Sequence, residues 1–163
     1  MSIESLVNDC LIEHEGGEKF FNAIDERLRN DNLLMAMILS RVLQNESFDY
    51  LIVSGTFGHV FKDFCIKSFG ENIGKVIVTV NGGIRKGNIV GEIDKDFSNK
   101  NIVFIDDSFY LGRTRDKIKE LVKSKGGNLI CSYVFYDGSK NKDENVHSFY
   151  RYYDHYKEDE KSK

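Results

Sequence analysis

Two adjacent carboxylates, Asp106 and Asp107, stand at the end of an apolar run, residues 102–105, that has the composition of a buried strand. Carboxylates in such a position are costly to remove from water unless they accept hydrogen bonds or face cations. Ribose hydroxyls would supply the hydrogen bonds, and Mg²⁺ would supply the cation. The pair is therefore the first candidate for a ligand site, although an Asp-Asp pair taken alone is more often a turn and a helix cap.

The segment after the acids, residues 108–114, predicts a turn that opens a helix. Gly112 permits a close backbone approach, and the free amides at the start of the helix favour an anion such as phosphate. Thr114 adds a hydroxyl donor, and Arg113 adds a guanidinium that can form two hydrogen bonds with phosphate oxygens. The residues of this segment that we expect to contact a substrate are Ser108, Phe109, Tyr110, Leu111, Gly112, Arg113 and Thr114.

Two more polar clusters follow apolar runs that predict strands. In an open parallel sheet, ligands bind beyond the carboxyl ends of the strands, so we expect these clusters to meet the two acids in space. Each also has a simpler interpretation, with Thr56 as a helix N-cap in the first cluster and solvated loop charges in the second. The candidate residues are Ser54, Gly55 and Thr56 after the run at 50–53, and Arg85 and Lys86 after the run at 76–80.

The elements that must position these residues alternate between strand and helix patterns. Strands that are apolar on both faces and alternate with helices predict an α/β fold, with a central parallel sheet flanked by helices. Asp31 or Asn32 is the expected N-cap of the second helix. We expect strands at residues 50–53, 76–80, 101–105 and 129–136, and helices at 18–29, at about 33–43, from 57 to Gly70, and around 118–122 with an end at Gly126.

Length and composition narrow the class of protein. The 163 residues are the size of one domain, and the net charge of -3 does not indicate nucleic-acid binding. The longest apolar run, residues 33–39, is far shorter than the roughly 20 residues that span a bilayer, so no membrane association is expected. Cys10, Cys65 and Cys131 lack Cys-x-x-Cys spacing, which favours a cytoplasmic location and neither a disulfide framework nor a cysteine zinc site.

The stretch at residues 102–107 (IVFIDD), followed by Tyr110, Gly112, Arg113 and Thr114, resembles the phosphoribosyl pyrophosphate (PRPP) signature of type I phosphoribosyltransferases. In that family, four apolar residues and two acids precede a Thr-Gly-x-Thr turn. The spelling Tyr-x-Gly-Arg-Thr is similar to the version in pyrimidine-operon regulators that retain uracil phosphoribosyltransferase activity. The order of the expected elements between residues 50 and 136 also fits the core of the family.

The resemblance implies a transfer of phosphoribose from PRPP to a nitrogenous base, with release of pyrophosphate and with Mg²⁺ as cofactor. Asp106 and Asp107 would hold the ribose hydroxyls, directly or through the metal, as catalytic and metal-binding residues. The amides of residues 110–114 would hold the 5-phosphate. Pyrophosphate would meet Gly55, Thr56 and Arg85, with Lys86 beside them.

The resemblance also implies a Rossmann-like core with a small hood, all within a single domain, residues 1–163. We expect the core at about residues 31–137 and the hood in residues 1–30, in residues 138–156, or in both. Enzymes of this family are commonly dimers, so a homodimer is expected. The aromatic residues between positions 147 and 156 are then more readily packing or a dimer contact than a platform for a nucleobase.

Two residues depart from the family pattern. Leu111 replaces the Thr or Ser that gives a hydroxyl to the 5-phosphate, so weaker PRPP binding is expected. Tyr110 stands where the 6-oxopurine enzymes have an Asp, so a pyrimidine is the favoured acceptor. Leu111 also motivates an alternative function, a non-catalytic regulatory module that binds PRPP or a nucleotide on the same fold.

Overall fold

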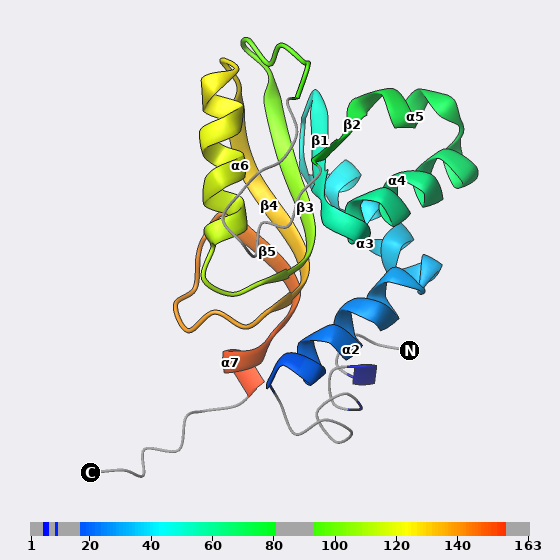
Figure 1. Cartoon of the computed structure of the whole chain (residues 1–163), viewed down its shortest axis with the longest axis vertical. Helices are drawn as coiled ribbons and strands as arrows, with labels where there is room; N and C mark the ends of the chain where they lie inside the picture. Colours follow the sequence, from blue (N-terminus) through cyan, green and yellow to red (C-terminus); the bar gives the residue numbers. More distant parts are fainter. Residues whose placement is uncertain (1–4, 7–8, 10–16, 81–92, 156–163) are drawn as a thin grey trace.

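Figure 1 shows the computed structural model of the chain, which describes residues 5–6, 9, 17–80 and 93–155. Five strands form one sheet in the order β2-β1-β3-β4-β5, and each neighbouring pair is parallel. This sheet confirms the predicted α/β class. The strands are β1 (Tyr50–Ser54), β2 (Ile77–Val80), β3 (Asn101–Phe109), β4 (Asn128–Asp137) and β5 (Val146–Arg151).

Helices cover both faces of the sheet, as strands that are apolar on both faces require. On one face lie α2 (Gly17–Arg29), α3 (Asn32–Asn45) and α4 (Gly55–Phe69), and on the other lies α6 (Arg113–Ser124). The short helices α5 (Glu71–Val76) and α7 (Tyr152–His155) complete the described elements. No helix within the described residues is long and apolar enough to cross a membrane.

The helix ends follow from local chemistry that the sequence carries. Asp31 caps α3, because its carboxylate accepts hydrogen bonds from the amides of Leu33 and Leu34 at 3.0 and 3.1 Å. Gly70 ends α4, and Gly126 follows α6 with a φ of 78°, a conformation that favours glycine. These boundaries confirm the predicted helix ends.

Two differences from the prediction lengthen the sheet. The pairs Ser108↔Tyr136 and Phe109↔Asp137 carry β3 past the expected end at residue 105. The two acids therefore lie inside the strand, and the turn before α6 is only residues 110–112. Residues 146–151 form a fifth strand, so the core extends beyond the expected limit at residue 137. Between β4 and β5, the rings of Tyr136 and Tyr150 stack with their centroids 6.0 Å apart, and both side chains are buried.

The passage from β1 to α4 has no loop. Ser54 is both the last residue of the strand and the N-cap of the helix, so the expectation of Thr56 as the N-cap was wrong. Gly55 takes a φ of 60°, which turns the chain at once into the helix. Gly58 then lies against the strand, where a Cβ atom would meet the carbonyl carbon of Val53 at 2.9 Å. A glycine is needed at position 58 because the helix touches the backbone of the strand.

Replacing Gly58 by Ala is expected to lower the free energy of unfolding by about 1–3 kcal/mol, because the strand backbone cannot give way to the added methyl group. Urea denaturation of the purified protein measures the change. Ser68→Ala, at an exposed position of the same helix, is the control and is expected to stay within about 0.5 kcal/mol. Equal stability of the two variants would contradict the close contact between α4 and β1.

Candidate active site

The candidate site lies at the centre of the sheet, where β1 ends beside the residues of β3 that follow Ile105. After β1 the chain passes into α4 on one face, where Phe57 and Phe61 join the larger core cluster. After β3 it passes into α6 on the other face, where Ile118 and Val122 pack. Because the two connections leave toward opposite faces, the position between these strands is where open α/β sheets bind ligands in a crevice, and we call it the candidate crevice.

Side chains from both strands meet in this crevice. The hydroxyl of Ser54, at the end of β1, donates a hydrogen bond to the Asp106 carboxylate on β3. The amide of Asp107 donates to Asp106 Oδ1 at 3.0 Å, and Ser108 Oγ donates to Asp107 Oδ1 at 3.1 Å. The structure thus brings together four of the residues that the sequence nominated.

The Asp106 carboxyl is held in an environment that disfavours its charge. Burial raises its pKa well above the usual range, and the negative charges of Asp107 and Asp25 add to the effect. The hydrogen bonds from Ser54 and from the Asp107 amide oppose this shift without cancelling it. A cation or a set of hydroxyl donors would relieve the repulsion, and two carboxylates form an oxygen donor set that suits Mg²⁺.

Asp25 is a site residue that the sequence did not nominate. It lies on α2, is only 8% exposed, and is close enough to raise the pKa of both Asp106 and Tyr110. Helix α2 contacts β3 and lies beyond the end of the sheet where the strands finish (Figure 1). The sequence signal is weak, because an acid beside the apolar stripe of an amphipathic helix is usually exposed.

Tyr110 occupies the space next to the acids. Burial, followed by the neighbouring Tyr136, Asp25 and Asp107, raises the pKa of its phenol, and a hydrogen bond with Ser108 opposes the shift. The ring is 5.7 Å from that of Tyr136. It also lies against Gly138, where a Cβ atom would come within 2.5 Å of the ring. Tyr110 is thus a neutral phenol in a fixed place.

The turn and the start of α6 present a mixed set of groups. Gly112 has a φ of 72°, a left-handed conformation that favours glycine. The side chain of Leu111 is 75% exposed, and that of Arg113 is also exposed. Arg115, by contrast, is held by an ion pair with Asp143 and lies over the ring of Phe109 at 5.4 Å. Among these groups, Arg113 is the guanidinium available to a ligand.

Comparisons with known proteins identify the fold. No family model matches the chain, and no curated protein matches it in sequence. Among solved structures, the purine phosphoribosyltransferase from Pyrococcus horikoshii is similar at 16% identity, with a TM-score of 0.54 over 72% of this chain and 79% of that chain. The adenine phosphoribosyltransferase from Thermoanaerobacter pseudethanolicus gives 16% identity and a TM-score of 0.52, over 82% and 81%. The chain has the type I phosphoribosyltransferase fold.

A third structure with this phosphoribosyltransferase fold is the UMP synthase of Leishmania donovani, which is 15% identical with a TM-score of 0.54. The match covers 80% of this chain and 30% of that larger protein. These likenesses confirm the fold that the IVFIDD stretch and the turn after it predict. They include neighbours named for purine bases and one named for a pyrimidine nucleotide.

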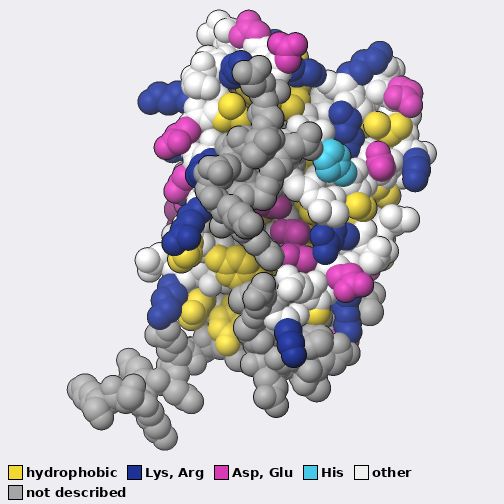
Figure 2. Space-filling view, viewed as in Figure 1, with side chains coloured by type: hydrophobic (Ala, Val, Ile, Leu, Met, Phe, Trp, Pro, Cys, Tyr) yellow, Lys and Arg dark blue, Asp and Glu magenta, His cyan; other side chains and the backbone are white. Residues whose placement is uncertain are grey.

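Two of the nominated residues lie outside the part of the chain that the structure describes. Arg85 and Lys86 fall in residues 81–92, so their place at the site stays a prediction. Gly55 and Thr56 form the first turn of α4, with Thr56 exposed. Figure 2 shows acidic side chains near the middle of this face of the phosphoribosyltransferase fold, with Lys and Arg side chains to either side.

Replacing Asp106 by Asn is expected to stabilise the free protein at neutral pH, because it removes a charge that burial and Asp107 disfavour. The pKa of Asp106 is higher in the folded than in the unfolded protein. The stabilising contribution of this carboxyl to the free energy of unfolding is therefore fully present below the unfolded pKa. It is lost as the pH rises through the folded pKa. Urea unfolding of both proteins between acid and neutral pH measures the difference in their free energies of unfolding, which should widen as the pH rises. If the free energies of unfolding of the two proteins changed in parallel with pH, the raised pKa would be contradicted. Asp63→Asn, at an exposed position of α4, is the control.

Proposed function

We propose that the protein transfers phosphoribose from PRPP to a nitrogenous base and releases pyrophosphate. The observation that carries this proposal is the meeting of Ser54, Asp106 and Asp107 in the crevice between β1 and β3. On a phosphoribosyltransferase fold, an acidic pair at this point is suited to a ribose, whose two hydroxyls donate to carboxylates. The names of the structural neighbours support the same class of reaction.

The reaction needs groups that are positioned in advance more than it needs a nucleophile. Positive charge grows at the anomeric carbon and negative charge grows on pyrophosphate as the bond between them breaks. Asp106 and Asp107 hold the ribose and favour the positive charge. They are also the residues that would hold Mg²⁺, whose contribution when bound is to neutralise charge on the pyrophosphate. The fixed geometry of the crevice lowers the entropic part of the barrier.

The phosphates of PRPP are assigned to the two helix starts beside the crevice. The amides of residues 110–114, with the hydroxyl of Thr114 and the guanidinium of Arg113, would receive the 5-phosphate at the start of α6. Gly55 and Thr56, at the start of α4, would receive the pyrophosphate, and Arg85 and Lys86 would neutralise it. This assignment places the leaving group on the opposite side of the acids from the 5-phosphate.

For the acceptor we propose a pyrimidine. Tyr110 stands beside the acids with a phenol whose pKa is raised, so the phenol keeps its proton at neutral pH. Such a group donates a hydrogen bond and cannot accept a proton from the ring of the base. Hypoxanthine and guanine are therefore the disfavoured acceptors, because the 6-oxopurine enzymes have an Asp at this position. We further propose that the active form is a homodimer.

A second candidate function is a regulatory module that binds PRPP or a nucleotide without turnover. The observation that favours it is Leu111, whose exposed apolar side chain gives no hydroxyl to the turn. The backbone amides of the turn would still bind a phosphate, with fewer contacts than the family pattern provides.

Pyrophosphate release separates the two functions. The protein is incubated with PRPP, Mg²⁺ and, in turn, uracil, orotate, hypoxanthine, guanine, xanthine and adenine. We expect release with a pyrimidine and a loss of at least tenfold, about 1.4 kcal/mol, in Asp107→Asn. Binding of PRPP by calorimetry without release for any base would favour the regulatory module. No binding of PRPP would overturn the transferase, and no binding of either PRPP or a nucleotide would overturn both functions.

Replacing Leu111 by Thr is expected to tighten PRPP binding some ten- to a hundredfold, because a hydrogen bond to a charged phosphate is worth about 1.5–3 kcal/mol. Folding should be unaffected, since the side chain at this position is exposed. Leu111→Val is the matched control, because Val has the shape of Thr without the hydroxyl. Calorimetry with saturating Mg²⁺ measures the three affinities. Equal affinities of the Thr and Val variants would mean that this turn does not hold the phosphate.

A further inference from the structure

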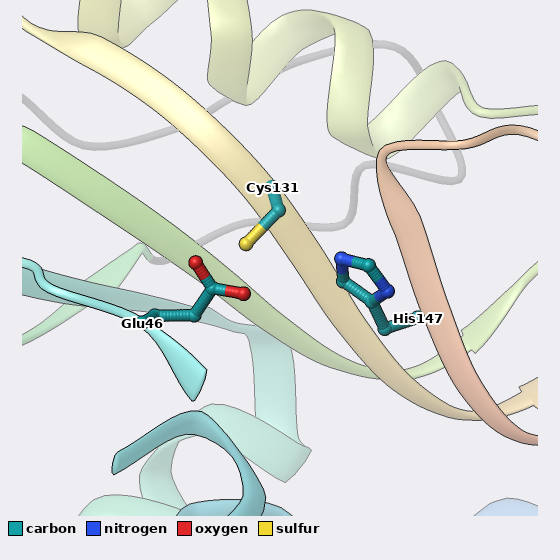
Figure 3. A group of neighbouring side chains, drawn as sticks. All are labelled: Glu46, Cys131 and His147. Atoms are coloured by element: carbon teal, nitrogen blue, oxygen red, sulfur yellow. The ribbon is translucent and has the colours of Figure 1, made fainter. Parts of the chain in front are cut away.

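A second group of chemically active side chains lies away from the candidate PRPP crevice. Glu46 follows the end of α3, Cys131 lies on β4, and His147 lies on β5. Figure 3 shows the Cys131 sulfur pointing toward the Glu46 carboxylate, with the His147 ring on its other side. One ligand atom of each residue lies within 4.8 Å of the other two, an arrangement found nowhere else among the described His, Cys, Asp and Glu side chains.

The group is separate from the acidic pair. Cys131 pairs with Val103, and Asp106 lies three residues further along β3. At about 3.3 Å per residue, the two levels of the sheet are about 10 Å apart. Nothing in the assigned PRPP contacts uses Glu46, Cys131 or His147. The group therefore needs an explanation of its own.

The three donors match the preferences of one kind of metal ion. Zn²⁺ binds thiolate, imidazole and carboxylate groups, usually four ligands at the corners of a tetrahedron. One thiolate and one carboxylate together balance the two positive charges of the ion. Bonds of about 2.0–2.3 Å place tetrahedral ligand atoms about 3.6 Å apart, so the present spacing needs only a small contraction. Glu46 is part-exposed and His147 is exposed, so both side chains have room to move.

Strand β4 has an irregular pairing next to Cys131. Ile102 pairs with Leu129 but Val103 pairs with Cys131, so β4 carries one extra residue at position 130. Such an irregularity re-aims the side chain that follows it, and it occurs preferentially beside functional sites. Here the side chain that follows is Cys131, which is 7% exposed. The extra residue thus sets the thiol on the side of the sheet where Glu46 lies.

Tyr133 supports two of the three donors. Its hydroxyl donates a hydrogen bond to Glu46 Oε1 at 2.8 Å, and its ring lies 4.8 Å from the His147 ring. Residues that hydrogen-bond to metal ligands and fix their orientation are a regular part of metal sites. Tyr133 leaves the second carboxylate oxygen of Glu46 available to an ion. A positioning residue is therefore already in place.

Reaction by the thiol alone does not account for the group. Burial, with the Glu46 carboxylate beside it, raises the pKa of Cys131 to about 12. The thiol therefore keeps its proton at neutral pH, whereas nucleophilic cysteines have a lowered pKa. A metal ion reverses this preference, because it binds the thiolate and displaces the proton.

We propose that Glu46, Cys131 and His147 bind one Zn²⁺ ion, with a water molecule as the fourth ligand. The ion joins the end of α3 to β4 and to the edge strand β5, which are distant in sequence. Its expected role is structural, because the site is separate from the crevice and the bound ion would tie β5 to the sheet. An open position held by water also leaves room for a ligand from another molecule.

The test uses the full chain, freed of metal, with Co²⁺ as a spectroscopic probe that Zn²⁺ then displaces. We expect absorption typical of tetrahedral coordination and the charge-transfer band that only a thiolate ligand gives, with the band saturating at one Co²⁺ per chain. Zn²⁺ should also raise the midpoint of thermal unfolding as its concentration increases. Absence of the thiolate band, or a band that does not saturate at one bound ion per chain, would overturn the proposal.

Variants assign the ligands. His147→Gln is the decisive one, because the side chain is exposed and its loss leaves the core intact. It should weaken Co²⁺ and Zn²⁺ binding at least tenfold, as should Glu46→Gln, while Cys131→Ser should abolish the thiolate band. Tyr133→Phe should weaken binding tenfold to a hundredfold and keep the band, as expected of a positioning residue. Unchanged affinity in His147→Gln would overturn the site.

Matched controls come from helix α4. Cys65 is the other described cysteine and is buried like Cys131, and His59 is exposed like His147. Cys65→Ser and His59→Gln should bind the metal as the unaltered chain does. Loss of the thiolate band in Cys65→Ser would also overturn the assignment. The measurement needs no PRPP, so its outcome is independent of the proposed transferase activity.

Discussion

The pairing of β1 with β3 is the constraint on which the rest of the molecule depends. It sets Ser54 next to Asp106 at the centre of the sheet, and it sends the following helices, α4 and α6, to opposite faces. The crevice and its hydrogen bond are two results of the same backbone register. If the register moved by one residue, Ser54 would face the other side of the sheet and the acids would lose their partner.

The acids of the crevice carry a cost that the large core offsets. Asp106, Asp107 and Asp25 gather negative charge in one place, and burial together with this charge raises the pKa of Asp106. A protein selected for stability alone would place other residues here. The arrangement suits a ligand that brings hydroxyl groups and a cation. Such a ligand would remove the repulsion between the acids, so the free energy that the repulsion costs in folding would be recovered on binding.

Much of the fold could be predicted because the pattern repeats locally. Four strands are apolar on both faces, Asp31 caps its helix, and glycines mark the helix ends. The fifth strand was not predicted, because it follows a polar loop and combines buried and half-buried aromatic residues at the edge of the sheet. The acids and the hydroxyl of Ser54 could be nominated because they follow strands.

Asp25 and the group around Cys131 could not be nominated from the sequence. Asp25 is a single acid in an amphipathic helix, and no residue near it in sequence reveals that α2 contacts β3. Glu46 is distant in sequence from Cys131 and His147, which lie on two consecutive strands, so no short spacing motif connects the three. Only the parallel pairing of β4 with β5, and the position of α3 over them, brings these side chains together.

The contact between Gly138 and Tyr110 links two segments that would otherwise vary independently. The chain leaves β4 through a position without a side chain, and the ring of Tyr110 occupies the space that a Cβ atom would need. The loop toward β5 therefore shares control of the aromatic group beside the acids. In related chains, a larger residue at this position would require a smaller or displaced one in place of the tyrosine. The two positions can change only together, so their joint variation among relatives would record changes in what the crevice accepts.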